Sequence, residues 1–117
     1  MSGGARERGL AAETTALQFL ERRGLRLVER NARSARGEID LVMDDNGTLV
    51  FVEVRYRANP RYGSGADSVG RIKQTRLIAA AQAYLQRSGA HRRPARFDVV
   101  SIGPADAIDW IPDAFQA

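Results

Sequence analysis

The sequence contains no cysteine among its 117 residues, and it contains a single lysine and a single histidine. Without cysteine, the chain can form neither disulfides nor thiolate metal sites, which is compatible with a reducing compartment. Its apolar runs are far shorter than the ~20 residues that a membrane span requires. The first residues, Met-Ser-Gly-Gly-Ala-Arg, lack the apolar core of a signal peptide. We therefore expect a cytoplasmic protein with no membrane partner.

Basic residues are absent after Arg96, and many of those before it lie in clusters. Six arginines fall between Arg22 and Arg36, and the formal net charge is +4. The arginine guanidinium matches the oxygens of phosphate, so such clusters favour nucleic acid as a partner. A solvated arginine-rich surface accounts for the charge equally well. Charge alone therefore leaves both explanations open.

Length and periodicity predict one domain over residues 1–117, with a disordered start at residues 1–5. A first helix is expected over residues 6–23, where Leu10, Thr14, Leu17 and Leu20 share a face. A second is expected from about residue 68 to 87, capped by Asp67 or Ser68 and ended by Gly89.

Short apolar or alternating segments predict strands over residues 25–30, 37–43, 48–56, 96–102 and 107–111. Residues 57–66 contain proline and glycine and are expected to form a mobile loop. The resulting order, αβββαββ, predicts an α/β fold in which helices flank a mixed β-sheet.

The pairing of two predicted strands follows from the turn between them. Asn46-Gly47 is the strongest short signal for a two-residue hairpin loop. If Asp45 pairs with Thr48, Asp40 lies opposite Glu53, and Glu38 lies opposite Arg55. Alternation then puts these four side chains on one face. The other face carries only core residues, namely Ile39, Leu41, Met43, Val50, Val52 and Val54. A loop of three residues would break this arrangement.

Carboxylates on directly opposed residues have Cβ atoms roughly 5 Å apart, so Asp40 and Glu53 should repel each other. A divalent cation removes this cost, because Mg²⁺ prefers hard oxygen ligands. The alternative interpretation is that Glu38 and Arg55 form a cross-strand ion pair while Asp40 and Glu53 face solvent.

Two charged residues interrupt the apolar stripes of the predicted helices. Glu13 lies on the stripe of the first helix, four residues before Leu17. Lys73, the only lysine, lies midway between Val69 and Leu77 on the stripe of the second. A charge in such a place is costly without a partner. A single charged residue in such a place usually lies at the rim of the core, where its charged end reaches solvent. Taken together, however, Glu13 and Lys73 predict a cluster with Asp40 and Glu53.

These residues resemble a nuclease motif. The pattern resembles the D…(D/E)xK motif of the PD-(D/E)xK nuclease superfamily: Asp40 is followed, after twelve residues, by Glu53-Val54-Arg55. Residues from about Arg8 to Phe115 are similar to the YraN family of small bacterial proteins, which is related to Holliday junction resolvases. The matching segments are Gly9 with Glu13, Arg30-Asn31, Gly37-Glu38-Ile39-Asp40-Leu41, Phe51-Val52-Glu53-Val54-Arg55, Lys73 with Arg76, and Arg96-Phe97-Asp98-Val99-Val100.

The resemblance implies a restriction-endonuclease-like core with a Mg²⁺- or Mn²⁺-dependent endonuclease site. Asp40, Glu53 and the Val54 carbonyl would bind the metal, and Glu13 would act on it through water. The lysine of the motif is replaced by Arg55, and arginine cannot deprotonate. Because a relocated lysine is known in the superfamily, Lys73 becomes a candidate for that role. The catalytic candidates are thus Glu13, Asp40, Glu53, Arg55 and Lys73.

Three functions remain compatible with the sequence. The leading one is an endonuclease that binds nucleic acid, structured DNA first and RNA second, and hydrolyses phosphodiester bonds. The second is a non-catalytic nucleic-acid-binding module on a nuclease fold, and the third is a domain whose arginines contact acidic proteins. A homodimer is compatible with each. In the first two, the nucleic-acid path is expected along Arg30, Arg33, Arg36, Arg57, Arg61 and Tyr62.

Overall fold

The computed structural model describes residues 5–56, 69–90 and 92–117. Their elements are α1 (Ala5–Arg22), β1 (Arg26–Ser34), β2 (Gly37–Asp45), β3 (Thr48–Tyr56), α2 (Arg71–Ser88), β4 (Ala95–Ile102), the 3₁₀ turn η2 (Pro104–Asp106) and β5 (Ile108–Phe115). This order confirms the predicted αβββαββ arrangement. Neither described helix is long and apolar enough to cross a membrane.

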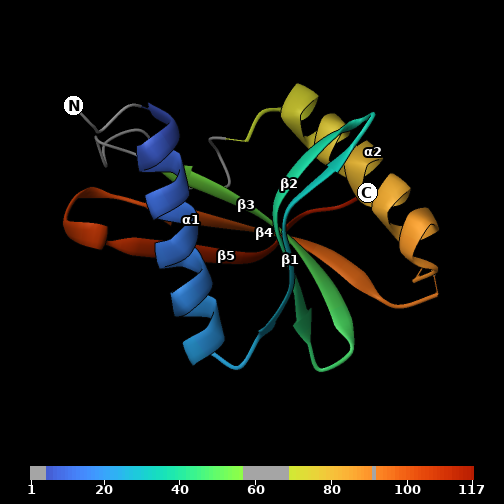
Figure 1. The fold of residues 1–117 in the computed structure, drawn as a ribbon, viewed down its shortest axis with the longest axis horizontal. Helices are drawn as coiled ribbons and strands as arrows, with labels where there is room; N and C mark the ends of the chain where they lie inside the picture. The colour runs from blue at the N-terminus through green and yellow to red at the C-terminus, as the bar shows by residue number, and fades with distance from the viewer. Residues whose placement is uncertain (1–4, 57–68, 91) are drawn as a thin grey trace.

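The strands form one mixed sheet in the order β1-β2-β3-β4-β5. Neighbouring strands are antiparallel except for β3 and β4, which are parallel. A parallel pair needs a long crossover connection, and α2 lies within it. α1 and α2 pack on opposite faces of the sheet (Figure 1), since consecutive residues of β3 alternate between the two helices.

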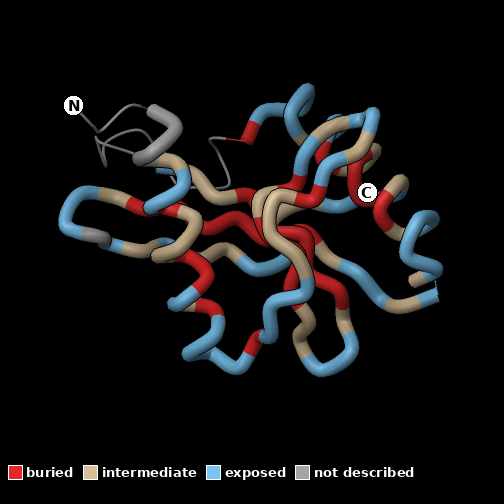
Figure 2. The backbone as a smooth tube through the Cα atoms, in the orientation of Figure 1, coloured by how far each residue is buried: buried red, intermediate tan, exposed pale blue. Residues whose placement is uncertain are grey.

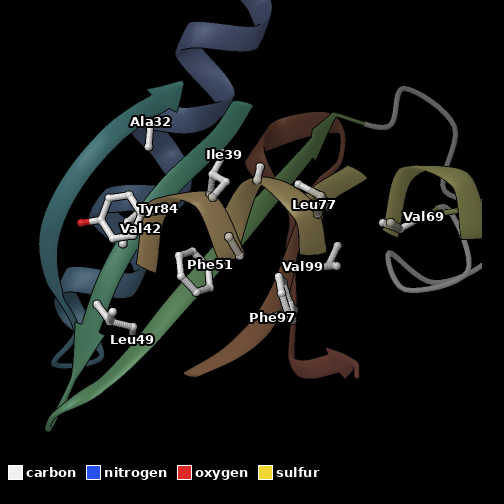
Figure 3. Packing of buried hydrophobic residues seen from close by; sticks show 12 residues of the cluster. Ala32, Ile39, Val42, Leu49, Phe51, Val69, Leu77, Tyr84, Phe97 and Val99 are labelled. Atoms are coloured by element: carbon white, nitrogen blue, oxygen red, sulfur yellow. The ribbon is translucent and has the colours of Figure 1, made fainter. Parts of the chain in front are cut away.

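Each helix covers its own hydrophobic cluster. The cluster beneath α2 includes Phe51, Leu77 and Tyr84 (Figure 3). The cluster beneath α1 includes Leu20 and Val52. Buried residues are concentrated in the central strands and on one side of each helix (Figure 2). Full burial of each large side chain stabilises the fold by about 1.5–3 kcal/mol, so both helices are held firmly against the sheet.

The hairpin between β2 and β3 has the predicted register. Asp45 pairs with Thr48, and the ladder continues to Leu41 and Val52. Asn46 and Gly47 have φ angles of 52° and 97°, as a two-residue loop with positive φ at both positions requires. The Asp44 side chain accepts a hydrogen bond of 2.8 Å from the Gly47 amide, which further fixes the turn.

Two details of the predicted core are wrong. Leu10 is 43% exposed, because α1 turns Ala12, Ala16, Leu17 and Leu20 toward the sheet. Ile39 belongs to the cluster beneath α2, although alternation from Leu41 assigned it to the opposite face. Beyond Leu41, β2 is paired only with β1, so the faces of this segment no longer follow those of the central sheet.

Several predicted boundaries also shift. α2 begins at Arg71 after Gly70, with no side-chain cap, and the proposed caps Asp67 and Ser68 lie outside the described residues. The expected loop at 57–66 and residues 1–4 of the expected disordered start lie outside them as well, while Ala5 opens α1. Gly89 ends α2 with φ 73°, as predicted.

Candidate functional site

Three acidic residues on three elements converge at one end of the β2–β3 hairpin. Glu13 comes from α1, Asp40 from β2 and Glu53 from β3. Asp40 and Glu53 directly follow the last pair of the ladder, Leu41 and Val52. At this point the Asp40 Oδ2 atom accepts a hydrogen bond of 2.9 Å from the Val54 amide. The Asp40 side chain thus accepts a hydrogen bond from a backbone amide just beyond the Leu41–Val52 pair, which fixes its carboxyl beside Glu53.

The carboxyls are crowded and shielded from water. Glu53 is only 5% exposed. The pKa of Asp40 is raised to about 8, first by burial and second by the neighbouring charge of Glu53, while the Val54 amide opposes the shift. The pKa of Glu13 is also raised, chiefly by burial, with an interaction with Asn31 opposing it. Raised carboxyl pKa values of this kind, caused by burial and by a neighbouring like charge, are common at functional sites.

Three cations of the chain face these acids. Lys73 Nζ lies 3.3 Å from Glu53 Oε2, and Arg55 Nη1 lies 3.6 Å from the same oxygen. Arg30 Nη2 lies 3.7 Å from Glu13 Oε1. The predicted cluster of Glu13, Asp40, Glu53 and Lys73 is therefore assembled, with Arg30 and Arg55 added to it.

The alternative interpretation of the hairpin is wrong. Glu38 pairs with Arg33 at 2.8 Å, and Arg55 pairs with Glu53. Glu53 does not face solvent, because α2 covers this face of the sheet as well. Lys73 is less buried than its place on the apolar stripe suggested: its side chain is 46% exposed, and its charged end reaches Glu53 at the rim.

Two hollows flank Glu38 and lead to the acids. One, of about 450 Å³, is lined by Gly9, Leu10, Glu13, Asn31, Arg33 and Glu38. The other, of about 250 Å³, is lined by Gly37, Glu38, Asp40, Lys73, Arg76 and Leu77. Glu13 is therefore reached from one side of Glu38, whereas Asp40 and Lys73 are reached from the other.

The fit of a metal can be judged from the oxygens present. Within the described residues, no three histidine or acidic side chains are arranged to hold a metal ion by themselves. Asp40 and Glu53 nevertheless offer two hard carboxylates side by side, and Glu13 Oε1 is buried without a hydrogen-bond partner. Mg²⁺ is commonly bound by one or two carboxylates and several waters. The donors thus fit a Mg²⁺ or Mn²⁺ site completed by a backbone carbonyl and water.

The predicted nucleic-acid path is described only in part. Arg33 and Arg36 are exposed on the β1–β2 hairpin, with the Arg33 side chain 81% exposed. Arg30 instead turns toward Glu13 and also donates a hydrogen bond of 3.2 Å to Thr14. The remaining candidates, Arg57, Arg61 and Tyr62, lie outside the described residues.

Two residues, which the family resemblance had matched, lie at the site although they were not predicted as site residues. Asn31 interacts with Glu13 and has a φ of 52° within β1. Asparagine tolerates this conformation better than most residues, but the sequence gives no sign that the strand needs it there. Arg76 lines the hollow that contains Asp40 and Lys73. It could have been found, because it follows Lys73 by three residues and so shares its helix face.

Comparison with known proteins identifies relatives over nearly the whole chain. A profile of the uncharacterised protein family UPF0102 matches residues 12–102, a span that contains Glu13, Asp40, Glu53 and Lys73. A UPF0102 protein of Nitrosococcus oceani is 53% identical over 115 residues, which are 95% of this chain and 93% of the relative. A UPF0102 protein of Pseudomonas syringae is 49% identical over 93% of each chain. One of Burkholderia pseudomallei is 51% identical over 99% of this chain and 80% of the relative.

Proposed function

This chain belongs to the uncharacterised protein family UPF0102, and we propose that it is a metal-dependent endonuclease that binds structured DNA and hydrolyses its phosphodiester bonds. The observation that carries the proposal is the meeting of Glu13, Asp40 and Glu53 beside a lysine, with Lys73 Nζ 3.3 Å from Glu53. Crowded carboxylates next to an amine suit metal-dependent phosphodiester hydrolysis, in which a bound metal ion polarises the phosphate and activates a positioned water. The proposal includes membership of the PD-(D/E)xK nuclease superfamily, supported by the mixed sheet with flanking helices.

In this proposal the acids hold the cofactor. Asp40 and Glu53 would bind Mg²⁺ or Mn²⁺ together with the Val54 carbonyl, and Glu13 would contact it through water. A divalent cation bound there would polarise the phosphate and lower the pKa of a water molecule. Asp40 is already anchored by the Val54 amide at 2.9 Å, so its carboxyl is oriented before any ligand arrives.

The two cations next to Glu53 have different chemical capacities. Lys73 carries a compact amine that can orient the attacking water and exchange a proton. Arg55 donates hydrogen bonds to phosphate but remains charged, so it can stabilise developing negative charge without relaying protons. We assign water positioning to Lys73 and phosphate contact to Arg55. Both side chains are partly exposed, as contact with a substrate demands.

A second candidate function is a non-catalytic module that binds nucleic acid on the same scaffold. The observation that favours it is the pairing of Glu53 with both Arg55 and Lys73, which occupies one oxygen of a proposed metal ligand. Such a protein would bind nucleic acid through its arginines with no need for Mn²⁺.

The experiment that separates these functions uses the purified protein with Mn²⁺ and labelled duplex, flap, junction and single-stranded substrates. Cleavage should require Mn²⁺ and should be lost in Asp40→Ala. Asp109→Ala is the matched control, because Asp109 is an exposed aspartate on β5, outside the acidic cluster. Cleavage that persists in Asp40→Ala would assign it to another site or to a contaminant, and binding without cleavage would favour the second candidate.

A further inference from the structure

The acids of the site are balanced by cations of the same chain. Arg30 lies 3.7 Å from Glu13, and Arg55 and Lys73 lie 3.6 and 3.3 Å from Glu53, which is the neighbour of Asp40. A site that binds a divalent cation gains from an excess of negative charge. The balance in the free protein therefore works against metal binding, and two of these cations, Arg55 and Lys73, already have roles in the proposed chemistry.

Arg30 is the cation that has no such role. Its guanidinium donates a hydrogen bond of 3.2 Å to Thr14 and lies 3.7 Å from Glu13 Oε1. It does not hydrogen-bond that oxygen, which is buried without any partner. Arg30 thus offsets the charge of Glu13 but does not supply the hydrogen bond that its Oε1 atom lacks. Because a buried acceptor without a donor is costly, exchange of Arg30 for a better partner is favourable.

We propose that Arg30 is a displaceable counter-ion, which neutralises Glu13 in the free protein and moves to a phosphate group when nucleic acid binds. The inference rests on the proposed function and assigns a regulatory role within that site. A guanidinium is suited to the exchange, because it binds phosphate through two parallel hydrogen bonds. The Arg30 side chain is 33% exposed, so a phosphate at the rim can reach it.

The exchange makes two ligands cooperative. When Arg30 turns to phosphate, the negative charge of Glu13 is no longer offset by Arg30 and can attract a divalent cation. When Glu13 instead accepts a cation first, Arg30 is released for phosphate. Thermodynamic linkage requires the two effects to be equal in size. The site is thereby kept in a charge-balanced, weakly metal-binding state until nucleic acid is present.

The test is equilibrium binding of Mn²⁺ to the full-length protein, followed through the electron paramagnetic resonance signal of free Mn²⁺. The same variants are then tested for binding of a labelled phosphorothioate DNA duplex, by anisotropy with and without Mn²⁺. The key variant is Arg30→Gln, and Arg26→Gln is its matched control. Arg26 lies on the same strand, loses the same charge, and pairs with Asp44 at 3.2 Å, away from the acids. Arg30→Lys retains the charge, so its affinity for Mn²⁺ without DNA should match that of the natural protein.

Without DNA, Arg30→Gln should bind Mn²⁺ roughly two- to fivefold more tightly than Arg26→Gln, the worth of one partly exposed ion pair. The coupling between Mn²⁺ and DNA, about fivefold or more in the natural protein, should shrink in Arg30→Gln alone. If Arg30→Gln does not fold, Arg30→Met, which also removes the charge but keeps a long unbranched side chain, replaces it with the same expected gain.

Equal Mn²⁺ affinities for Arg30→Gln and Arg26→Gln, or unchanged coupling, would overturn the inference while the proposed function stands. Absence of Mn²⁺ binding in every variant, the natural protein included, would overturn both. A purely structural Arg30 would lower the melting temperature when replaced, but it would not raise the affinity for metal.

Discussion

The carboxyl group of Asp40 on β2 lies close enough to that of Glu53 on β3 for the charge of Glu53 to raise the pKa of Asp40. Two carboxylates this close cannot both ionise without a large cost. Burial adds to that cost, and the pKa of Asp40 rises to about 8. Without a metal, the pair therefore holds a proton at neutral pH. Changes of pH and of divalent cation concentration should both act on this pair, which makes it the first place to test.

The stability of the metal-free protein should fall as pH rises from about 5 to about 8. The folded-state pKa of Asp40, about 8, lies above the ordinary value of about 3.9 for an unfolded chain. Across this window the folded state binds more protons than the unfolded state, so removing them destabilises it. Glu13, whose pKa burial also raises, acts in the same direction. We expect a loss of at least about 1 kcal/mol in the free energy of unfolding, measured by urea denaturation in EDTA.

Asp40→Asn provides the control for this pH effect. The amide does not titrate, so most of the pH dependence should disappear, apart from the part contributed by Glu13. Asp109→Asn, on the exposed face of β5, should keep the dependence of the natural protein. Stability that rises between pH about 5 and 8 would contradict a raised pKa for Asp40.

Mn²⁺ should raise the melting temperature of the natural protein, because a ligand of the folded state stabilises it by mass action. The rise should be larger at pH about 8 than at about 6, since the carboxyls must lose their proton to bind metal. Asp40→Ala should abolish it. Thermal denaturation at a fixed Mn²⁺ concentration measures both proteins. A rise of equal size in Asp40→Ala would show that the metal binds elsewhere.

Affinity for DNA should fall steeply with salt, because phosphate contacts release counterions. Arg33 and Arg36 are exposed on one hairpin, and replacing both by glutamine should reduce the slope of log affinity against log salt by about 2. The pair Arg22→Gln and Arg26→Gln, around the C-terminal end of α1, removes equal charge and should change the slope less. Affinity that does not vary with salt would exclude nucleic acid as the natural partner.

The central part of the site could be predicted because local signals determine it. Asn46-Gly47 fixes the hairpin register, and the register brings Asp40 beside Glu53. The helical period correctly predicted that Glu13 lies on the side of α1 that faces the sheet and that Lys73 lies near Asp40 and Glu53. These are relations within one hairpin or one helix, where spacing along the chain determines spacing in the fold.

The rest depends on packing between distant segments, which local periodicity does not encode. β1 contains a register shift between Leu27 and Glu29, and no residue pattern announces it. Pairing of Arg30 with Glu13 requires the relative placement of β1 and α1, and pairing of Lys73 with Glu53 requires that of α2 and β3. Ile39 changed face for the same reason, where β2 leaves its partner β3.

Asp98 should be important for stability and not for the site. It is fully buried, and its carboxylate accepts hydrogen bonds from Arg96, from the Trp110 indole and from the Asp113 amide. This network joins β4 to β5. Asp98→Ala should lower the free energy of unfolding by about 3–5 kcal/mol, because Arg96 keeps only Asp45 as a partner and the Trp110 indole and Asp113 amide lose their acceptor. The melting temperature of the folded variant should still rise with Mn²⁺. A decrease of less than about 1 kcal/mol in the free energy of unfolding would contradict the role assigned to Asp98.

Lys73 should supply the chemistry that Arg55 cannot. Its Nζ lies 3.3 Å from Glu53, and its side chain lines the hollow that contains Asp40, whereas arginine does not release a proton. Lys73→Arg should therefore lower Mn²⁺-dependent cleavage by about 100-fold or more. Arg55→Lys in that background should partly restore cleavage, with folding checked by melting. Unchanged cleavage in Lys73→Arg would remove Lys73 from the chemistry. If cleavage arises only with Arg55→Lys, the natural protein is a binding module, because the amine at the motif position was then the missing group.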